Sequence, residues 1–301
     1  MNARVLPVLA TCLVATLAGC GLGGADEAAG DQPSLVVGSA NFPENALLAE
    51  IYAGALRDEG LDVSTELNVG SRETLLPAMQ RGDITVLPEY TGALLSHLSK
   101  GAAEATDTAG QVEELAAALP DELVLLEPSE AQDQETITCT AEVAEEHGLT
   151  SIADLAPVSR QLVFGGPPEL PSREGFGLKG LKALYDVEFK TFRPLDVSGP
   201  LTVSALKEGK VDCANLFSTQ SAIEVNGFVS LTDPKGLVES EAVVPLVARD
   251  AATKDVTDAL NAVSAALTTE GLKAMVKRVE VDKDDARAVA DDFLGDLEDA
   301  R

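Results

Sequence analysis

Short apolar runs alternate with amphipathic stretches along the chain from residue 35 onward. Continuous or alternating apolar residues are typical of strands, and apolar residues three or four positions apart are typical of helices. These patterns predict, in order, strand 35–39, helix 43–56, strand 61–67, helix 74–81 and strand 84–87. This β-α-β-α-β order predicts a mainly parallel sheet with helices on both faces, and such sheets bind ligands at the carboxyl ends of their strands.

The rest of the chain predicts a second unit of the same class. The polar stretch 129–135 marks the place where the chain crosses from the first unit to the second, and residues 237–248 mark the place where it crosses back. Two α/β units joined by two crossings form a cleft, which is a preferred place for a small ligand. The further predicted elements are helix 105–118, strand 123–126, helix 152–155, strand 161–164, helix 177–184, strand 189–194, helix 201–208, strand 211–217 and a largely helical segment 251–297.

The N-terminal residues have the pattern of an export signal. Arg4 supplies a positive start, and the apolar run 5–17 is too short to span a bilayer. Leu17-Ala18-Gly19-Cys20 resembles the bacterial lipobox, in which cleavage precedes the cysteine and its thiol carries a lipid. We therefore expect a signal peptide over 1–19, lipidation at Cys20 and a flexible tether over 20–33 on the outer face of the cell membrane. The alternative is an ordinary secretory signal with a chance cysteine.

The net charge indicates which partners to expect, and the cysteine content indicates a cross-link. The formal net charge is −28, which repels phosphate backbones and excludes nucleic acid as an expected partner. The same charge suits a cationic or zwitterionic ligand, and it also suits simple solubility outside a cell. Cys139 and Cys213 are the pair left after the signal, and an even pair in an oxidising location predicts a disulfide.

Motifs of catalysis are missing from the sequence. It contains no Gly-x-Ser-x-Gly, no His-Glu-x-x-His and no Gly-x-x-x-x-Gly-Lys-Ser/Thr. His97 and His147 are the only histidines, which leaves little material for a catalytic triad. We therefore expect a binding protein rather than an enzyme, without cofactor or metal.

Several motifs occur in an order that is similar to one known family. In the first unit they are Val36 to Glu44, Gly70-Ser71, Gly82-Asp83-Ile84 and Pro88-Glu89-Tyr90-Thr91-Gly92. In the second unit they are Phe164 to Glu169, Arg173-Glu174-Gly175, Gly180-Leu181 and Gly209 to Asp212 leading to Phe217-Ser218-Thr219. Together they resemble the glycine betaine/choline/carnitine substrate-binding proteins of ABC importers, over about residues 35–295.

The resemblance implies an aromatic cage around a quaternary ammonium head. Such a head donates no conventional hydrogen bond, so the faces of π-systems are its best partners. Tyr90 keeps the first cage position, Phe217 replaces a second tyrosine, and Ile137 stands at a third position without a ring. Arg173 matches an arginine that binds the ligand's carboxylate in some members, and Arg72 offers a second bidentate grip.

Other readings of these positions remain open. Ser39 and Asn41 either donate to a ligand or cap the next helix, and Thr219 leaves the same ambiguity at the end of the Phe217 strand. Thr91 belongs to the expected site through its place beside Tyr90. Arg72 either contacts the ligand or faces solvent, and Arg173 either contacts the ligand or pairs within its own loop.

The resemblance implies an α/β fold with two lobes of the type II periplasmic-binding-protein kind and two crossover hinge segments. Lobe 1 is expected over 34–132 plus 244–301, and lobe 2 over 133–243. The expected function is an extracytoplasmic receptor that captures an osmolyte of this class and delivers it to a permease and its ATPase. Because the cage is incomplete, a receptor for another small zwitterion or amine is the alternative. An exported enzyme and a sensory lipoprotein are further alternatives.

Overall fold

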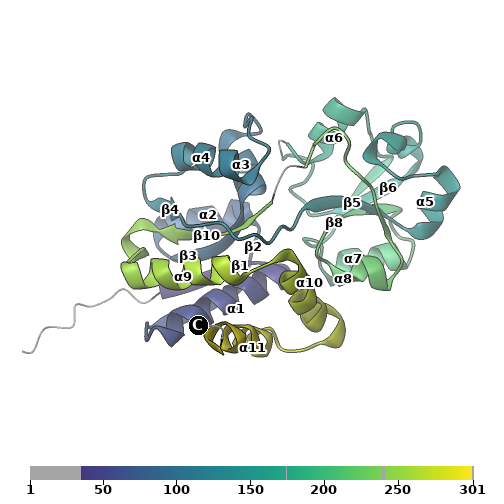
Figure 1. The fold of residues 1–301 in the computed structure, drawn as a ribbon. Coiled ribbons are helices and arrows are strands. Elements are labelled where there is room, and N and C mark those ends of the chain that lie inside the picture. The colour runs from purple at the N-terminus through teal and green to yellow at the C-terminus, as the bar shows by residue number, and fades with distance from the viewer. Residues whose placement is uncertain (1–34, 174, 239–240, 300–301) are drawn as a thin grey trace, which may run out of the picture. The chain divides into compact units, whose positions relative to one another are not determined.

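The computed structural model describes residues 35–173, 175–238 and 241–299. Two sheets, each of five strands, organise this part of the chain (Figure 1). The expected signal peptide, the tether and the lipid site at Cys20 lie outside the described residues. Within the described ranges, no helix has the length and apolar character needed to cross a membrane.

The first sheet has the strand order β2-β1-β3-β10-β4. β1 pairs in parallel with β2 and β3, whereas β10 pairs antiparallel with β3 and β4. This sheet and its helices are called lobe 1 below. Its elements are β1 (Leu35–Ala40), α1 (Pro43–Asp58), β2 (Val63–Gly70), α2 (Arg72–Arg81), β3 (Val86–Tyr90), α3 (Thr91–Ser99), α4 (Thr108–Ala118), β4 (Leu123–Leu125), β10 (Val243–Ala248), a 3-10 turn (Arg249–Ala251), α9 (Lys254–Ala266), α10 (Thr269–Lys277), a π-helical turn (Arg278–Asp282) and α11 (Ala286–Asp299).

The second sheet has the strand order β7-β6-β8-β5-β9 and repeats this plan. β6 pairs in parallel with β7 and β8, whereas β5 pairs antiparallel with β8 and β9. This sheet and its helices are called lobe 2. Its elements are β5 (Glu135–Cys139), α5 (Ala141–His147), 3-10 turns (Ile152–Leu155 and Ser159–Gln161), β6 (Val163–Gly166), α6 (Leu178–Tyr185), β7 (Thr191–Pro194), α7 (Pro200–Lys207), β8 (Cys213–Phe217), α8 (Ser221–Val225) and β9 (Val229–Ser230).

The parallel start predicted from the apolar pattern is confirmed, and several elements were not predicted, among them β5, β10 and α3. β5 and β10 each begin inside or just after a predicted crossing, and each enters its sheet as an antiparallel strand. α3 begins at Thr91, directly after β3, so the helix starts without an intervening loop. The helix expected over 105–118 begins later, at Thr108, because the Asp107 side chain accepts a hydrogen bond from the Gly110 amide and caps it.

The two segments that connect the lobes pair with one another. Gln132 and Ala242 form an antiparallel bridge. The Asp133 amide donates to the Glu241 carbonyl at 3.0 Å, and the Val243 amide donates to Ala131 at the same distance. A short two-stranded ladder therefore links the lobes, and Asp133 and Glu241 belong to it.

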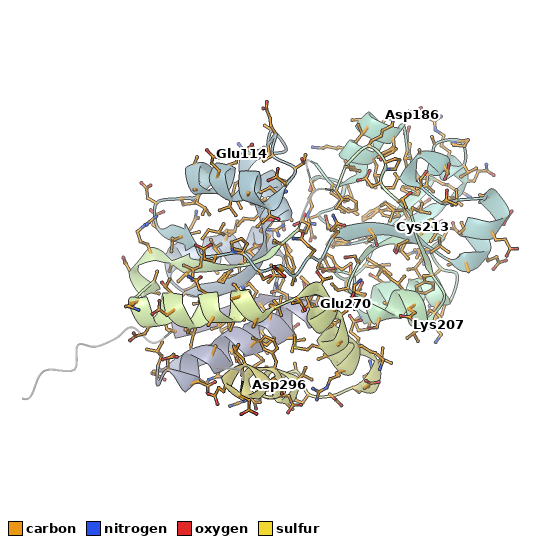
Figure 2. All side chains as sticks on the ribbon, viewed as in Figure 1. Glu114, Asp186, Lys207, Cys213, Glu270 and Asp296 are labelled. Carbon is orange, nitrogen blue, oxygen red and sulfur yellow. A yellow bond between two sulfur atoms is a disulfide. The ribbon has the colours of Figure 1, made fainter. Side chains whose placement is uncertain are left out.

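Each lobe has its own apolar core, and lobe 2 is cross-linked. The Cys139–Cys213 disulfide joins register partners of β5 and β8, as the cysteine count predicted (Figure 2). Both cysteines are fully buried. Charged side chains such as Lys207 and Asp296 lie on exposed faces of α7 and α11 (Figure 2).

Candidate functional site

Two contiguous cavities lie at the carboxyl ends of the central strands of the two sheets. The smaller one, called the aromatic cavity, has a volume of about 50 Å³, and the larger one has about 290 Å³. Residues of both lobes line each of them. The residues shared by the two cavities are Arg72, Ala93, Glu135, Arg173 and Glu241.

Three aromatic rings line the aromatic cavity. Tyr90 is the last residue of β3 and Phe217 the last residue of β8, so two central strands deliver their rings to one place. Phe42, which precedes α1, lies between them, with ring centroids 4.7 Å from Phe217 and 6.2 Å from Tyr90. The sequence predicted the two strand-end rings. Phe42 extends the cluster into a partial cage.

The ladder that links the lobes supplies carboxyl groups to the same cavity. Asp133, Glu135 and Glu241 all line it, and each is less than a tenth exposed. Burial raises the pKa of Asp133 to about 6 and raises the pKa of Glu135 and, more strongly, of Glu241. Burial disfavours the charged form of an acid, so a cation in the cavity would restore the ionised form.

A further buried acid, Glu44, connects the aromatic cluster to lobe 2. Its carboxyl accepts a hydrogen bond from the Tyr90 hydroxyl at 2.7 Å and one from the Thr219 hydroxyl at 2.5 Å. Asp133 accepts hydrogen bonds from the Thr219 amide at 3.0 Å and from the Ser218 hydroxyl at 3.2 Å. Burial, followed by the charge of Asp133, raises the pKa of Glu44 well above its ordinary value. The charge of Asp133 therefore disfavours the ionisation of Glu44, its buried neighbour.

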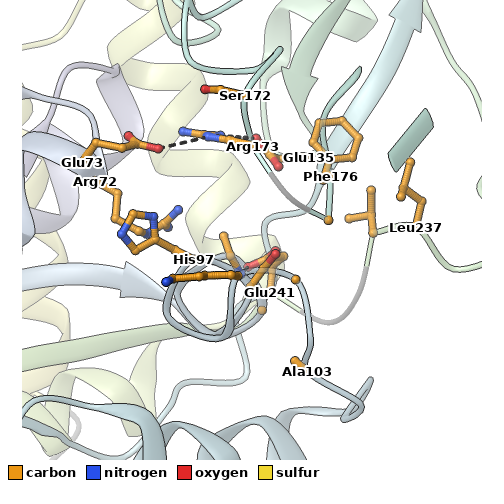
Figure 3. A pocket seen from close by; sticks show the side chains of 17 residues that line it. Arg72, Glu73, His97, Ala103, Glu135, Ser172, Arg173, Phe176, Leu237 and Glu241 are labelled. Atoms are coloured by element: carbon orange, nitrogen blue, oxygen red, sulfur yellow. Dashed lines mark hydrogen bonds and ion pairs between the residues drawn. The ribbon is translucent and has the colours of Figure 1, made fainter. Parts of the chain in front are cut away.

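The two arginines flank the point where the cavities meet. Arg72, the first residue of α2, binds Glu89 through Nε at 2.9 Å and Nη2 at 2.7 Å. Arg173 reaches Glu135 at 3.2 Å and Glu73 at 3.5 Å (Figure 3). It also reaches Glu169 at 3.2 Å. The ion pair between Arg173 and Glu73 joins lobe 2 to lobe 1.

The two polar residues expected to donate from the first loop, Ser39 and Asn41, line neither cavity. The Ser39 hydroxyl accepts a hydrogen bond from the Asn68 amide at 2.8 Å and is fully buried. Asn41 is exposed and lines neither cavity. Its neighbour Asn45 lines the aromatic cavity and links the Ala40 amide to the Pro88 carbonyl.

Two further expected residues are fully buried beside the site. Thr91 donates to Gln111 at 2.7 Å and accepts from the Ala242 amide at 3.2 Å, which ties α3 to the ladder. Ile137 lies in the apolar core of lobe 2 with Cys139 and lines neither cavity. Thr219 acts through Glu44, and it is not itself part of either lining.

Comparison with known families decides the class of this protein. Residues 33–296 match the family model described as the substrate-binding domain of an ABC-type glycine betaine transport system. The chain belongs to this family. It is an extracytoplasmic substrate-binding protein of ABC transport and not an enzyme, as the sequence predicted.

Curated relatives agree with this assignment. The chain is 28% identical to the glycine betaine-binding protein YehZ of Escherichia coli K12, over 86% of this chain and 88% of the relative. It is 26% identical to a glycine-betaine-binding protein of Pseudomonas aeruginosa, over 87% of each chain. It is 25% identical to the carnitine transport binding protein OpuCC of Listeria monocytogenes, over 71% of this chain and 68% of the relative.

Solved structures confirm the predicted fold class, which is the two-lobed type II fold. A glycine betaine/carnitine/choline ABC transporter structure superposes with a TM-score of 0.65 at 19% identity, covering 88% of this chain and 98% of that one. Lactococcal OpuAC in its closed, glycine betaine-bound conformation gives 0.61 at 16% identity, covering 88% and 96%. The two sheets described above are the cores of the two lobes.

Sequence reasoning did not select several acids of this substrate-binding protein's cavity. Asp133 and Glu135 lie in the first predicted crossing, and Glu241 lies in the second. Glu89 belongs to the Pro-Glu-Tyr-Thr-Gly motif, but its pairing with Arg72 requires the fold. The sequence did contain one signal for these cavity acids, because acidic residues occur in both predicted crossings, and the crossings border the cleft of a two-lobe protein. Within the described residues, no group of three potential ligands is arranged to hold a metal ion.

Proposed function

We propose that this protein captures a quaternary ammonium solute of the glycine betaine, choline and carnitine class and delivers it to an ABC permease and its ATPase. The observation that carries the proposal is the aromatic cavity, where Phe42, Tyr90 and Phe217 lie beside buried carboxyl groups. The relatives named as glycine betaine-binding and carnitine-binding support the same class.

The chemistry of the cavity fits such a head group. A methylated ammonium group interacts with ring faces, each contact contributing about 0.5–2 kcal/mol. Three rings therefore supply roughly 2–6 kcal/mol before the cost of ordering the ligand. The nearby carboxylates of Asp133, Glu135 and Glu241 add charge attraction, which is stronger in a buried site than in water. Tyr90 and Phe217 are thus the proposed ligand-binding rings.

We further propose that capture closes two lobes about the ladder near Gln132 and Ala242. The proposed lobes are residues 34–132 with 244–301, and residues 133–243. Phe217 of lobe 2 contacts Phe42 of lobe 1, and Thr219 of lobe 2 donates to Glu44 of lobe 1. A ligand that touches both sides of such a cleft stabilises the state in which the lobes meet.

The N-terminal residues support a proposal about location. The lipobox-like Leu17-Ala18-Gly19-Cys20 would make Cys20 the first mature residue and the site of lipid attachment, with 20–33 as the tether. Replacing Cys20 by serine is expected to release the protein from the membrane fraction, and mass spectrometry of the mature native protein should report an acylated cysteine. An unmodified mature N-terminus upstream of Cys20 would refute lipidation.

Calorimetry with glycine betaine, choline and carnitine tests the ligand class. At least one is expected to bind. The Phe217→Leu variant should weaken that binding about tenfold, because it removes one ring face but keeps an apolar side chain. Phe217→Tyr is the matched control, since it keeps the ring and should retain binding. If none of the three solutes binds, the proposed class is wrong, although the family and fold stand.

A further inference from the structure

Both arginines at the cavity are already occupied by carboxylates of the protein. Nε and Nη2 of Arg72 both bind Glu89, in a pair whose side chains are only 12% and 4% exposed. All three guanidinium nitrogens of Arg173 face an acid, namely Glu73, Glu135 and Glu169. A carboxylate on a ligand would have to displace one of these protein carboxylates before gaining a bidentate grip.

The acids at the aromatic cavity also outnumber the bases. Its lining contains four carboxyl groups, from Glu89, Asp133, Glu135 and Glu241, against the guanidinium groups of Arg72 and Arg173. A zwitterion therefore brings its negative end toward like charge, whereas a plain cation does not.

One lining acid has an unused acceptor. Asp133 is 2% exposed, its Oδ2 atom receives no hydrogen bond from an N–H group or a hydroxyl, and its carboxyl lies beside that of Glu44. Its Oδ1 atom is engaged by Ser218 and Thr219. An unpartnered buried carboxylate oxygen is costly, and a cation held nearby compensates it.

We propose that this site selects a net cation over a zwitterion, so that a choline-like solute binds more tightly than glycine betaine, and that Glu89 sets this selectivity by holding Arg72. The inference rests on the proposed function and narrows it. Arg72 and Arg173 then act as ion-pair partners of the cavity's own acids and do not bind a ligand carboxylate.

Calorimetry at low ionic strength with choline and glycine betaine tests the selectivity. Choline is expected to bind at least about tenfold more tightly, the difference that one charge-assisted interaction makes. The neutral carbon analogue of choline, in which a tert-butyl group replaces the trimethylammonium head, should bind at least about tenfold more weakly than choline. Tighter binding of glycine betaine would overturn the inference and leave the proposed function standing, whereas no binding of any solute of the class would overturn the proposed function.

The Glu89→Gln variant tests the role of that residue. In the wild type, the Tyr90 amide donates a hydrogen bond to the Glu89 carboxylate at 3.1 Å, and the side-chain oxygen of glutamine can still accept it. The loss of the Glu89 charge frees Arg72 to bind a ligand carboxylate. The ratio of choline to glycine betaine affinity should fall about tenfold. Glu188→Gln, which breaks an exposed ion pair with Arg160 and Lys182, is the matched control and should leave the ratio unchanged. An unchanged ratio in Glu89→Gln would overturn the role of Glu89.

Glu89→Gln leaves the buried guanidinium of Arg72 without its charged partner, which could destabilise the fold. A double variant that removes both charges controls for this effect. Combining Arg72→Gln with Glu89→Gln removes both charges, so residue 72 can no longer hold a ligand carboxylate, while Arg173 keeps its three acidic partners. This double variant should bind choline and gain no affinity for glycine betaine. If the double variant gained as much affinity for glycine betaine as Glu89→Gln does, the proposed role of Arg72 would be wrong, because the double variant has no arginine at position 72.

Discussion

Replacing Asp133 by asparagine should make the empty protein more stable and the receptor weaker. Burial raises the pKa of Asp133 from 3.8 to about 6. One pKa unit corresponds to about 1.36 kcal/mol, so ionising this group in the folded state costs roughly 3 kcal/mol more than in the unfolded chain. Asparagine keeps the Oδ1 acceptor used by the Ser218 hydroxyl and the Thr219 amide and removes the charge.

The pH dependence has a definite sign. A carboxyl group whose pKa is raised by folding stabilises the folded state below its unfolded pKa, and that contribution is lost as pH rises through about 6. The advantage of Asp133→Asn should therefore be small near pH 4 and full above pH 7. Removing the Asp133 charge also lowers the raised pKa values of four neighbouring acids, because that charge is one of the causes that raise them, and this adds to the stability of the variant at neutral pH. The four acids are Glu44, Glu135, Glu241 and Glu280.

Thermal unfolding of both proteins between pH 4 and 8, without ligand, measures the effect. The melting temperature of Asp133→Asn should exceed that of the wild type by about 6–12 °C at pH 7.5, since 1 kcal/mol corresponds to about 2–4 °C in a chain of this size. Asp296→Asn, on the exposed face of α11, is the control and should show no such difference. A lower melting temperature for Asp133→Asn at pH 7.5, or a difference that does not change with pH, would refute the reasoning.

Three further predictions concern the disulfide, the Tyr90 hydroxyl and the approach of the lobes. Reducing the Cys139–Cys213 bond, whose partners are 74 residues apart, should destabilise lobe 2 by about 4 kcal/mol, seen as a lower melting temperature with reductant. Tyr90→Phe keeps the ring and loses the hydrogen bond to Glu44, so calorimetry should find the ligand affinity within about threefold while unfolding shows a loss of about 1 kcal/mol. Gly175→Ala should weaken ligand binding, because its Cβ would lie 2.4 Å from Ser96 Oγ of lobe 1 in a backbone at φ +72°; an unchanged affinity would contradict this contact.

The parallel core of each sheet could be predicted because burial on both faces leaves apolar runs in the sequence. β5 and β10 escaped prediction for a physical reason. Each continues a ladder segment that carries acids, and these acids are buried only because the other lobe and the cavity surround them. In a chain with 50 acidic residues, local pattern cannot separate such acids from solvated ones.

The candidate site was predictable where a side chain follows directly from a strand end. Tyr90 and Phe217 met this condition, and both line the aromatic cavity. Ile137 lies two residues beyond Glu135 in β5, about 7 Å further along the strand, and so reaches the core of lobe 2 instead. The pairing of Arg72 with Glu89 joins α2 to β3 and depends on tertiary packing that no spacing in the sequence encodes.

A crystal structure of the protein with choline would show which side chains hold the ligand. We expect the trimethylammonium head to lie against Phe42, Tyr90 and Phe217, within reach of Asp133, with the ion pairs of both arginines retained. A head group bound elsewhere, or a ligand held by Arg72 after Glu89 has been displaced, would contradict this expectation.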